Sequence, residues 1–217
     1  MQHTQDPITR EITLDQINFL SCLRTVEHAQ LATGKNEEKC VPELFSLFIS
    51  LLWALAYCTH TREGDMVIIV ALQRRNHDPE VQHVRKLNKR LWCVQKHPKK
   101  LCCRRPEGDG SRKTEISPRP RTISDAAFEK ETEKGHCLRG VLFLRVQGTV
   151  MDTYTRWCKK VVAHVLDWVC KNQRHVARST FASKLLSAGD AVDQGLLLAQ
   201  LLQELSLIHI SEPTRQE

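Results

Sequence analysis

Residues 138–148 read LRGVLFLRVQG, a short apolar run that lies between two further runs of the same kind. The first of these is TISDAAF at residues 122–128, and the second is VVAHVLDWV at residues 161–169. All three are short and rich in β-branched, leucine or aromatic residues, so they predict strands. Residues 179–204 follow with apolar residues at helical spacing. Three strands followed by a helix indicate an α/β (α+β) unit in this half of the chain.

The first half of the chain has the period of helices. Residues 44–58, LFSLFISLLWALAYC, follow Pro42, which is tolerated in a first helical turn, and they predict a central helix. Residues 79–97 predict a second helix whose basic residues lie largely off its apolar face. That face is formed by Val81, Val84, Leu87, Leu91 and Val94. Residues 66–75, MVIIVALQRR, fit a buried strand or a helix. Residues 11–23 suggest a strand or turn that leads into a helix.

The two halves are joined by a segment with the composition of a linker. Residues 104–121 contain three prolines and two glycines among several basic residues. We therefore expect a mostly helical domain over residues 1–103, a basic linker over residues 104–121 and a second domain over residues 122–204.

Basic residues are concentrated in one part of the chain. The net charge is +7, and from residue 74 to residue 121 there are fifteen Lys or Arg against five Asp or Glu. A stretch of this kind suits the phosphate backbone of a nucleic acid, although a solvated helix followed by a basic loop has the same composition. The candidate nucleic-acid-binding residues are Arg85, Lys86, Lys89, Arg90, Lys96, Lys99 and Lys100.

Cysteine usage and the longest apolar run bear on where the protein resides. The nine cysteines are scattered and odd in number, and no signal-peptide pattern opens the chain, so we expect reduced thiols and an intracellular, cytoplasmic or nuclear, protein. The apolar run at residues 44–58 is shorter than the roughly twenty residues of a membrane span, so we expect a buried helix and no membrane partner. Nothing in the sequence indicates a small-molecule substrate or an oligomeric state.

Three segments together resemble the Pol polyprotein of copia-type LTR retrotransposons. Residues 53–101, WALAYCTHTREGDMVIIVALQRRNHDPEVQHVRKLNKRLWCVQKHPKKL, are similar to the end of the reverse transcriptase, although the turn at residues 62–65 departs from the family pattern. Residues 123–144, ISDAAFEKETEKGHCLRGVLFL, resemble the first hairpin of the family's RNase H domain. Residues 168–188, WVCKNQRHVARSTFASKLLSA, resemble its helix segment. The resemblance implies the end of a reverse transcriptase followed by a truncated RNase H-like domain with a mixed sheet and a helix.

The resemblance also implies metal-dependent chemistry in the parent family. RNase H cleaves the RNA of an RNA/DNA hybrid with two Mg²⁺ or Mn²⁺ ions, which carboxylates hold. Asp125 matches the family's first catalytic metal ligand, whereas Lys184 occupies the position of the second, a glutamate. The remaining acids would lie beyond residue 204, and no YxDD-type polymerase motif occurs in the chain. We therefore expect a catalytically inactive fragment that does not bind the metals productively. The alternatives are a non-catalytic nucleic-acid-binding module and a decayed, non-functional remnant.

The last stretch of the sequence differs from what precedes it. Residues 205–215, LSLIHISEPTR, resemble the translation of a mosaic-end adapter that is used to tag sequencing libraries. We therefore expect residues 205–217 to be an adapter-derived artefact outside the fold, and the helix before them to end at residue 204.

Overall fold

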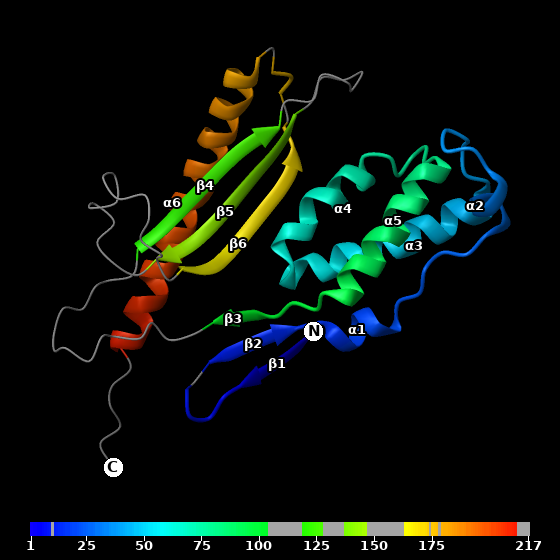
Figure 1. Ribbon diagram of the computed structural model, residues 1–217. Coiled ribbons are helices and arrows are strands. Elements are labelled where there is room, and N and C mark those ends of the chain that lie inside the picture. The colour runs from blue at the N-terminus through cyan, green and yellow to red at the C-terminus, as the bar shows by residue number, and fades with distance from the viewer. Residues whose placement is uncertain are drawn as a thin grey trace, which may run out of the picture. The chain divides into compact units, whose positions relative to one another are not determined.

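The computed structural model describes residues 1–9, 11–103, 119–127, 137–146, 163–173, 175–177 and 179–211. The chain forms two compact units, Met1–Arg105 and Pro106–Glu217. Each combines helices with a small antiparallel sheet, so the protein belongs to the mixed α and β class (Figure 1).

The first unit is built around two helices, α3 (Pro42–Cys58) and α5 (Val81–Lys96). Helix α3 begins at Pro42, whose fixed backbone angle suits a first turn, and it buries Leu44, Phe48, Leu52 and Leu55. Helix α5 contributes Val84, Leu87, Leu91 and Val94 to the same core, and its Val81 is also buried. Both helices and the predicted apolar face of α5 are confirmed.

Shorter helices complete the core of this unit. They are α1 (Ile17–Cys22), α2 (Ala29–Thr33) and α4 (Met66–Gln73). Two 3-10 turns, Thr59–Thr61 and Glu63–Asp65, join α3 to α4. The segment that fitted either a strand or a helix is therefore helical, and it buries Ile69 and Leu72 in the core that α3 and α5 share.

Helix α3 is also notable for its length and apolar composition. Pro42–Thr61 is long and apolar enough to cross a membrane. In this fold, however, six of its side chains lie in the core of the unit, as the prediction of a buried helix requires. The core helix of a globular unit passes the same test of length and composition.

Three short strands form the first sheet, in the order β1-β2-β3. Strand β2 (Ile12–Asp15) pairs antiparallel with β1 (Gln2–Gln5) on one side and with β3 (Leu101–Cys103) on the other. A strand or turn before α1 was predicted, and the structure shows strand β2 there, whereas β1 and β3 were not predicted. All four residues of β1 are exposed, so this strand lacks the alternation of apolar and polar residues on which sequence prediction depends.

The second unit contains the three predicted strands as an antiparallel sheet in the order β4-β5-β6. Strand β5 (Leu138–Val146) lies between β4 (Arg119–Ala127) and β6 (Ala163–Asn172). Its pairing with β6 shifts register between Phe143 and Leu144. The predicted mixed sheet is not found among the described strands, because neighbouring strands here run in opposite directions, whereas parallel neighbours need a long crossover connection.

Strand β4 begins earlier than the sequence indicated. It starts at Arg119, three residues inside the segment predicted as a linker, and the rest of that segment, residues 104–118, lies outside the described residues. Pro120 is compatible with a strand here because β4 is at the edge of the sheet, where a missing N–H group is tolerated.

Helix α6 (Thr180–Ser211) lies along one face of this sheet (Figure 1). Val141 and Phe143 of β5 and Ala191 of α6 form the buried centre of the unit. A Cβ atom at Gly195 would lie 2.7 Å from Thr122 Oγ1, so glycine allows the helix to approach β4 closely. The predicted start of the helix is confirmed.

The predicted end of that helix at residue 204 is wrong. Helix α6 continues to Ser211, seven residues into the segment that resembles an adapter. Residues 205–211, LSLIHIS, contain no glycine or proline that would interrupt a helix. Pro213 lies two residues beyond Ser211, and a proline disfavours the helical conformation of the residue before it. The helix therefore ends where the sequence first contains a strong breaking signal.

Candidate functional site

Helix α5 carries most of the residues that the sequence assigned to nucleic-acid binding. At its start, the Glu80 side chain accepts a hydrogen bond from the backbone of the third helical residue, and the Glu80 N–H donates to His83 Nδ1 at 2.9 Å. This reciprocal arrangement satisfies backbone groups that a helix end leaves unpaired. Burial lowers the pKa of His83 below its ordinary value, and the nearby Glu80 carboxylate opposes that shift.

The helix has one apolar and one basic side. The sixteen residues from Val81 to Lys96 include five Lys or Arg and no Asp or Glu. The side chains of Lys86, Lys89 and Lys96 are exposed, away from the buried apolar stripe. Lys99 and Lys100 follow the helix and are also exposed, and Lys100 Nζ lies 3.7 Å from the Asp15 carboxylate.

Arg85 is held by groups of its own unit. Its Nη2 donates to the backbone oxygens of Leu31 and Gly34, at 2.7 and 3.0 Å, and its Nη1 donates to Asn36 Oδ1. The guanidinium therefore satisfies carbonyl groups at the end of α2 and fastens that helix to α5. This arrangement gives Arg85 a structural role that the sequence did not reveal.

Arg90 is likewise engaged inside the unit. Its Nη2 forms an ion pair with Asp65, which also accepts a hydrogen bond from Arg62 Nε at 2.5 Å. Arg62 Nη1 donates to the His97 backbone oxygen at 2.9 Å, and burial lowers the Arg62 pKa. The Asp65 carboxylate is 6% exposed and lies between two guanidinium groups, so it links the turn before α4 to α5.

Trp92 is the one residue of this face that sequence reasoning missed. Its side chain is 55% exposed, and Lys96 Nζ lies 4.6 Å from the ring centroid, within the range of a cation–π contact. Lys89 precedes it by three residues and Lys96 follows it by four, so the three side chains are neighbours on the helix surface. The detectable signal was a tryptophan outside the apolar stripe of its own helix. We refer to Lys86, Lys89, Trp92 and Lys96 as the basic face of α5.

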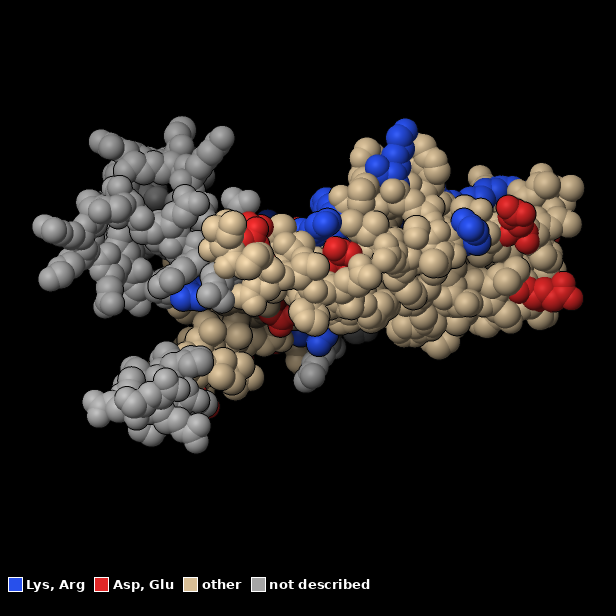
Figure 2. Space-filling view, turned by 90° about the horizontal axis from the view of Figure 1, so that it is seen from below, with Lys and Arg blue, Asp and Glu red and all other residues tan. Residues whose placement is uncertain are grey.

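Charged side chains are mixed on the side of the molecule that Figure 2 shows. There, Lys and Arg side chains are separated by uncharged residues and by occasional acids. On the basic face of α5, the lysines are aligned around an exposed indole.

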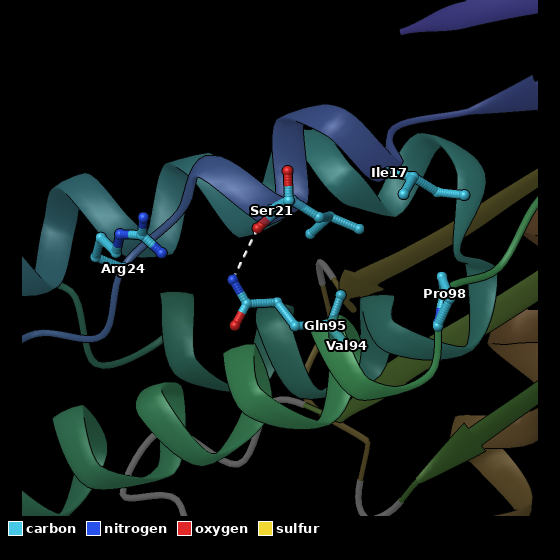
Figure 3. A pocket seen from close by; sticks show the side chains of 7 residues that line it. Ile17, Ser21, Arg24, Val94, Gln95 and Pro98 are labelled. Carbon is cyan, nitrogen blue, oxygen red and sulfur yellow. Dashed lines mark hydrogen bonds between the residues drawn. The ribbon is translucent and has the colours of Figure 1, made fainter.

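A surface cavity of about 320 Å³ lies between α1 and the C-terminal half of α5. Ile17, Leu20, Val94 and Pro98 give it an apolar lining, and Figure 3 shows Arg24 at one end and Pro98 at the other. Gln95 Nε2 donates to the backbone oxygen of Leu20 at 2.8 Å, the hydrogen bond drawn in Figure 3. Gln95 Nε2 also donates to the Leu23 backbone oxygen at 3.0 Å. The two bonds satisfy carbonyl groups at the end of α1, so Gln95 holds α1 against α5.

The structure brings together the two residues of the predicted metal site, but as an ion pair. Lys184 Nζ of α6 lies 3.3 Å from Asp125 Oδ1 of β4, and both side chains are more than half exposed. The Ser187 hydroxyl donates to the Asp125 backbone oxygen at 3.1 Å, which fixes this part of α6 to β4. A backbone hydrogen bond from Ala126 and the Lys184 ammonium lower the pKa of Asp125, so the carboxylate is ionised at neutral pH.

The residues around Asp125 do not fit a pair of divalent ions. Mg²⁺ and Mn²⁺ require several oxygen ligands, whereas Lys184 offers only donors and a positive charge. In the part of the chain that the structure describes, no group of three or more His, Cys, Asp or Glu side chains could hold a metal ion. The Asp125–Lys184 pair therefore has the chemistry of a surface salt bridge.

No protein-family model matches this sequence, and no similar curated protein or solved structure is found. The likeness to copia-type polyproteins thus stays a prediction from the quoted segments.

Proposed function

We propose that this protein binds nucleic acid through the basic face of α5 and that it derives from a copia-type retrotransposon Pol polyprotein. The observation that carries the binding proposal is the alignment of Lys86, Lys89 and Lys96 on the exposed side of a helix that has no acidic residue. Lys99, directly after the helix, extends the same run of charge. The expected partner is an RNA/DNA hybrid or another nucleic acid.

Lysine ammonium groups suit the phosphate backbone and are insensitive to sequence. Each neutralised phosphate releases condensed counterions, so this mode of binding weakens steeply as salt rises. An arginine guanidinium, in contrast, can recognise a base edge in the major groove by two parallel hydrogen bonds. Because Arg85 and Arg90 are bound to other parts of their unit, we expect affinity without marked sequence specificity.

We further propose that this chain does not cleave RNA/DNA hybrids, in contrast to its parent family. The donor set supports this: a metal-dependent nuclease needs several carboxylates around the scissile phosphate, and Asp125 is paired with an ammonium group instead. RNA-directed DNA synthesis and hybrid cleavage are thus proposed for the parent polyprotein alone.

The binding proposal is tested by salt-dependent fluorescence anisotropy with a labelled RNA/DNA hybrid. Replacing Lys89 and Lys96 with glutamine should reduce the slope of log affinity against log salt by about two, if each lysine contacts one phosphate. The matched control replaces Lys35 and Lys171, two exposed lysines outside α5, and removes the same charge. A slope that changes equally in both variants, or in neither, would contradict the proposal.

A further inference from the structure

The basic face of α5 contains an aromatic ring as well as charge. Trp92 is 55% exposed, although α5 has five apolar residues in the core and the ring has no part in that stripe. Lys89 and Lys96 flank it at spacings of three and four residues, which places one ammonium group on either side along the helix. An indole between two lysines offers a flat apolar surface and two sites for phosphate contact.

The contact between Lys96 and Trp92 places an ammonium group beside the indole ring. The Lys96 ammonium lies 4.6 Å from the ring centroid, so it covers part of the indole while more than half of the Trp92 side chain stays accessible. A nucleotide whose base lay against the remaining ring surface would bring its phosphate near Lys89 or Lys96. The cation and the ring would then contact the two chemically different parts of one nucleotide.

We infer that Trp92 is a base-stacking residue and that the basic face of α5 binds single-stranded nucleic acid in preference to duplex. The inference rests on the proposed function and adds the class of ligand. In a duplex, both faces of each internal base are covered by its neighbours, so the indole has no free base to stack on. In a single strand the bases unstack readily, and every base presents a face. Arg85 and Arg90 bind groups of their own unit. We therefore expect α5 to bind the ligand by base stacking and by phosphate contacts.

The test measures the affinity of the full chain for a labelled oligothymidylate and for a DNA duplex of equal length, at one salt concentration. We expect tighter binding of the single strand. Trp92→Ala should weaken single-strand binding by about five- to 150-fold, the range for loss of one stacked base, and should weaken duplex binding much less. Trp92→Tyr, which retains an aromatic ring, should recover most of the single-strand affinity.

The control is Trp53→Ala on α3, a tryptophan that is 56% exposed and lies outside the basic face. It should alter neither affinity. If Trp92→Ala weakens single strand and duplex equally, or neither, the stacking inference is wrong while the lysine-based function can still hold. If the unmodified chain binds no nucleic acid at low salt, the proposed function fails and the inference fails with it.

Discussion

Asp125 illustrates how a neighbouring side chain decides what a carboxylate binds. An aspartate on an edge strand with a second acid opposite would attract a divalent ion. Here Lys184 Nζ lies 3.3 Å away, and the Ala126 backbone hydrogen bond together with the Lys184 ammonium lowers the Asp125 pKa. Both groups are more than half exposed, so the pair adds little to stability. The ammonium group of Lys184 is the cation that Asp125 contacts in this structure.

We predict that Lys184→Glu does not create hybrid-cleaving activity. The variant would place two carboxylates near each other, but a pair of catalytic ions needs further bridging and terminal oxygens. The measurement is cleavage of a labelled RNA/DNA hybrid with Mg²⁺ and with Mn²⁺, beside an active ribonuclease H in the same buffers. Cleavage by the unmodified chain that Asp125→Asn abolishes would refute the inactive-fragment proposal.

His83 makes the stability of the first unit depend on pH. Its Nδ1 accepts the Glu80 N–H, and burial holds its pKa below the ordinary 6.5. When pH falls below that value, the unfolded chain takes up a proton that the folded chain resists. Folding stability is therefore fully present above about pH 6.5 and declines below it.

The pH effect is isolated by comparison with His83→Gln. A glutamine can accept the same hydrogen bond at this position but does not titrate. We expect the melting temperature of the unmodified chain to fall relative to that of the variant as pH decreases from 7.5 to 5.5, values on either side of the usual histidine pKa of about 6.5. A constant difference over this range would show that His83 has no part in the pH dependence.

At the scale of elements, Asp65 joins the turn before α4 to helix α5. Asp65 is 6% exposed, and its carboxylate contacts buried Arg62 and partly buried Arg90. Removal of the one acid leaves two guanidinium groups close together, one of them buried. We predict that Asp65→Ala lowers the free energy of unfolding by about 3–5 kcal/mol, the usual cost of breaking a buried ion pair from one side.

The measurement for Asp65 is urea unfolding followed by circular dichroism. The control is Asp78→Ala, because Asp78 pairs with Lys39 at 2.8 Å but both side chains are largely exposed. We expect the control to have a much smaller effect, since solvent already screens that pair. Equal losses in the two variants would mean that the Arg62–Asp65–Arg90 group contributes no more than a surface pair.

These elements differ in how far the sequence predicted them. Helices α3 and α5 were predictable because their apolar period is long and Pro42 marks one start. Strand β1 was not predictable, because its side chains are all exposed and show no apolar period. It forms a strand through its backbone pairing with β2. The roles of Arg85 and Arg90 were hidden for a related reason, since their partners lie far away in the sequence.

The candidate sites show the same limit. The lysines of α5 could be identified by composition, but composition cannot separate Lys89, which is exposed, from Arg85, whose partners Leu31, Gly34 and Asn36 are 49 to 54 residues away. The position of Trp92 outside the predicted apolar stripe indicates that it is exposed, but the sequence does not show the contact between its ring and Lys96.

At the scale of the whole molecule, the proposed interface and the contacts that support it belong to one unit. The basic face of α5, the guanidinium contacts of Arg85 and the Asp65 group all lie within Met1–Arg105. The described core of that unit consists of residues of α1, of α3 to α5 and Val26, with Leu31 of α2 packed against it, all within Met1–Arg105. The second unit has a separate core, centred on Val141, Phe143 and Ala191. The contribution of α5 to binding should therefore be retained by the first unit alone.

We predict that a protein of residues 1–105 binds oligothymidylate and that Trp92→Ala weakens its binding by the same factor as in the full chain. The absolute affinity and the salt slope should both decrease, because the shorter protein lacks the basic residues of positions 112–121. The factor due to Trp92 should persist, since effects of distant, independent contacts are additive. Circular dichroism of the shorter protein serves as the control for folding. If it retains its helices but Trp92→Ala no longer changes affinity, the ring does not contact the nucleic acid from the first unit alone, and the interface must include residues after 105.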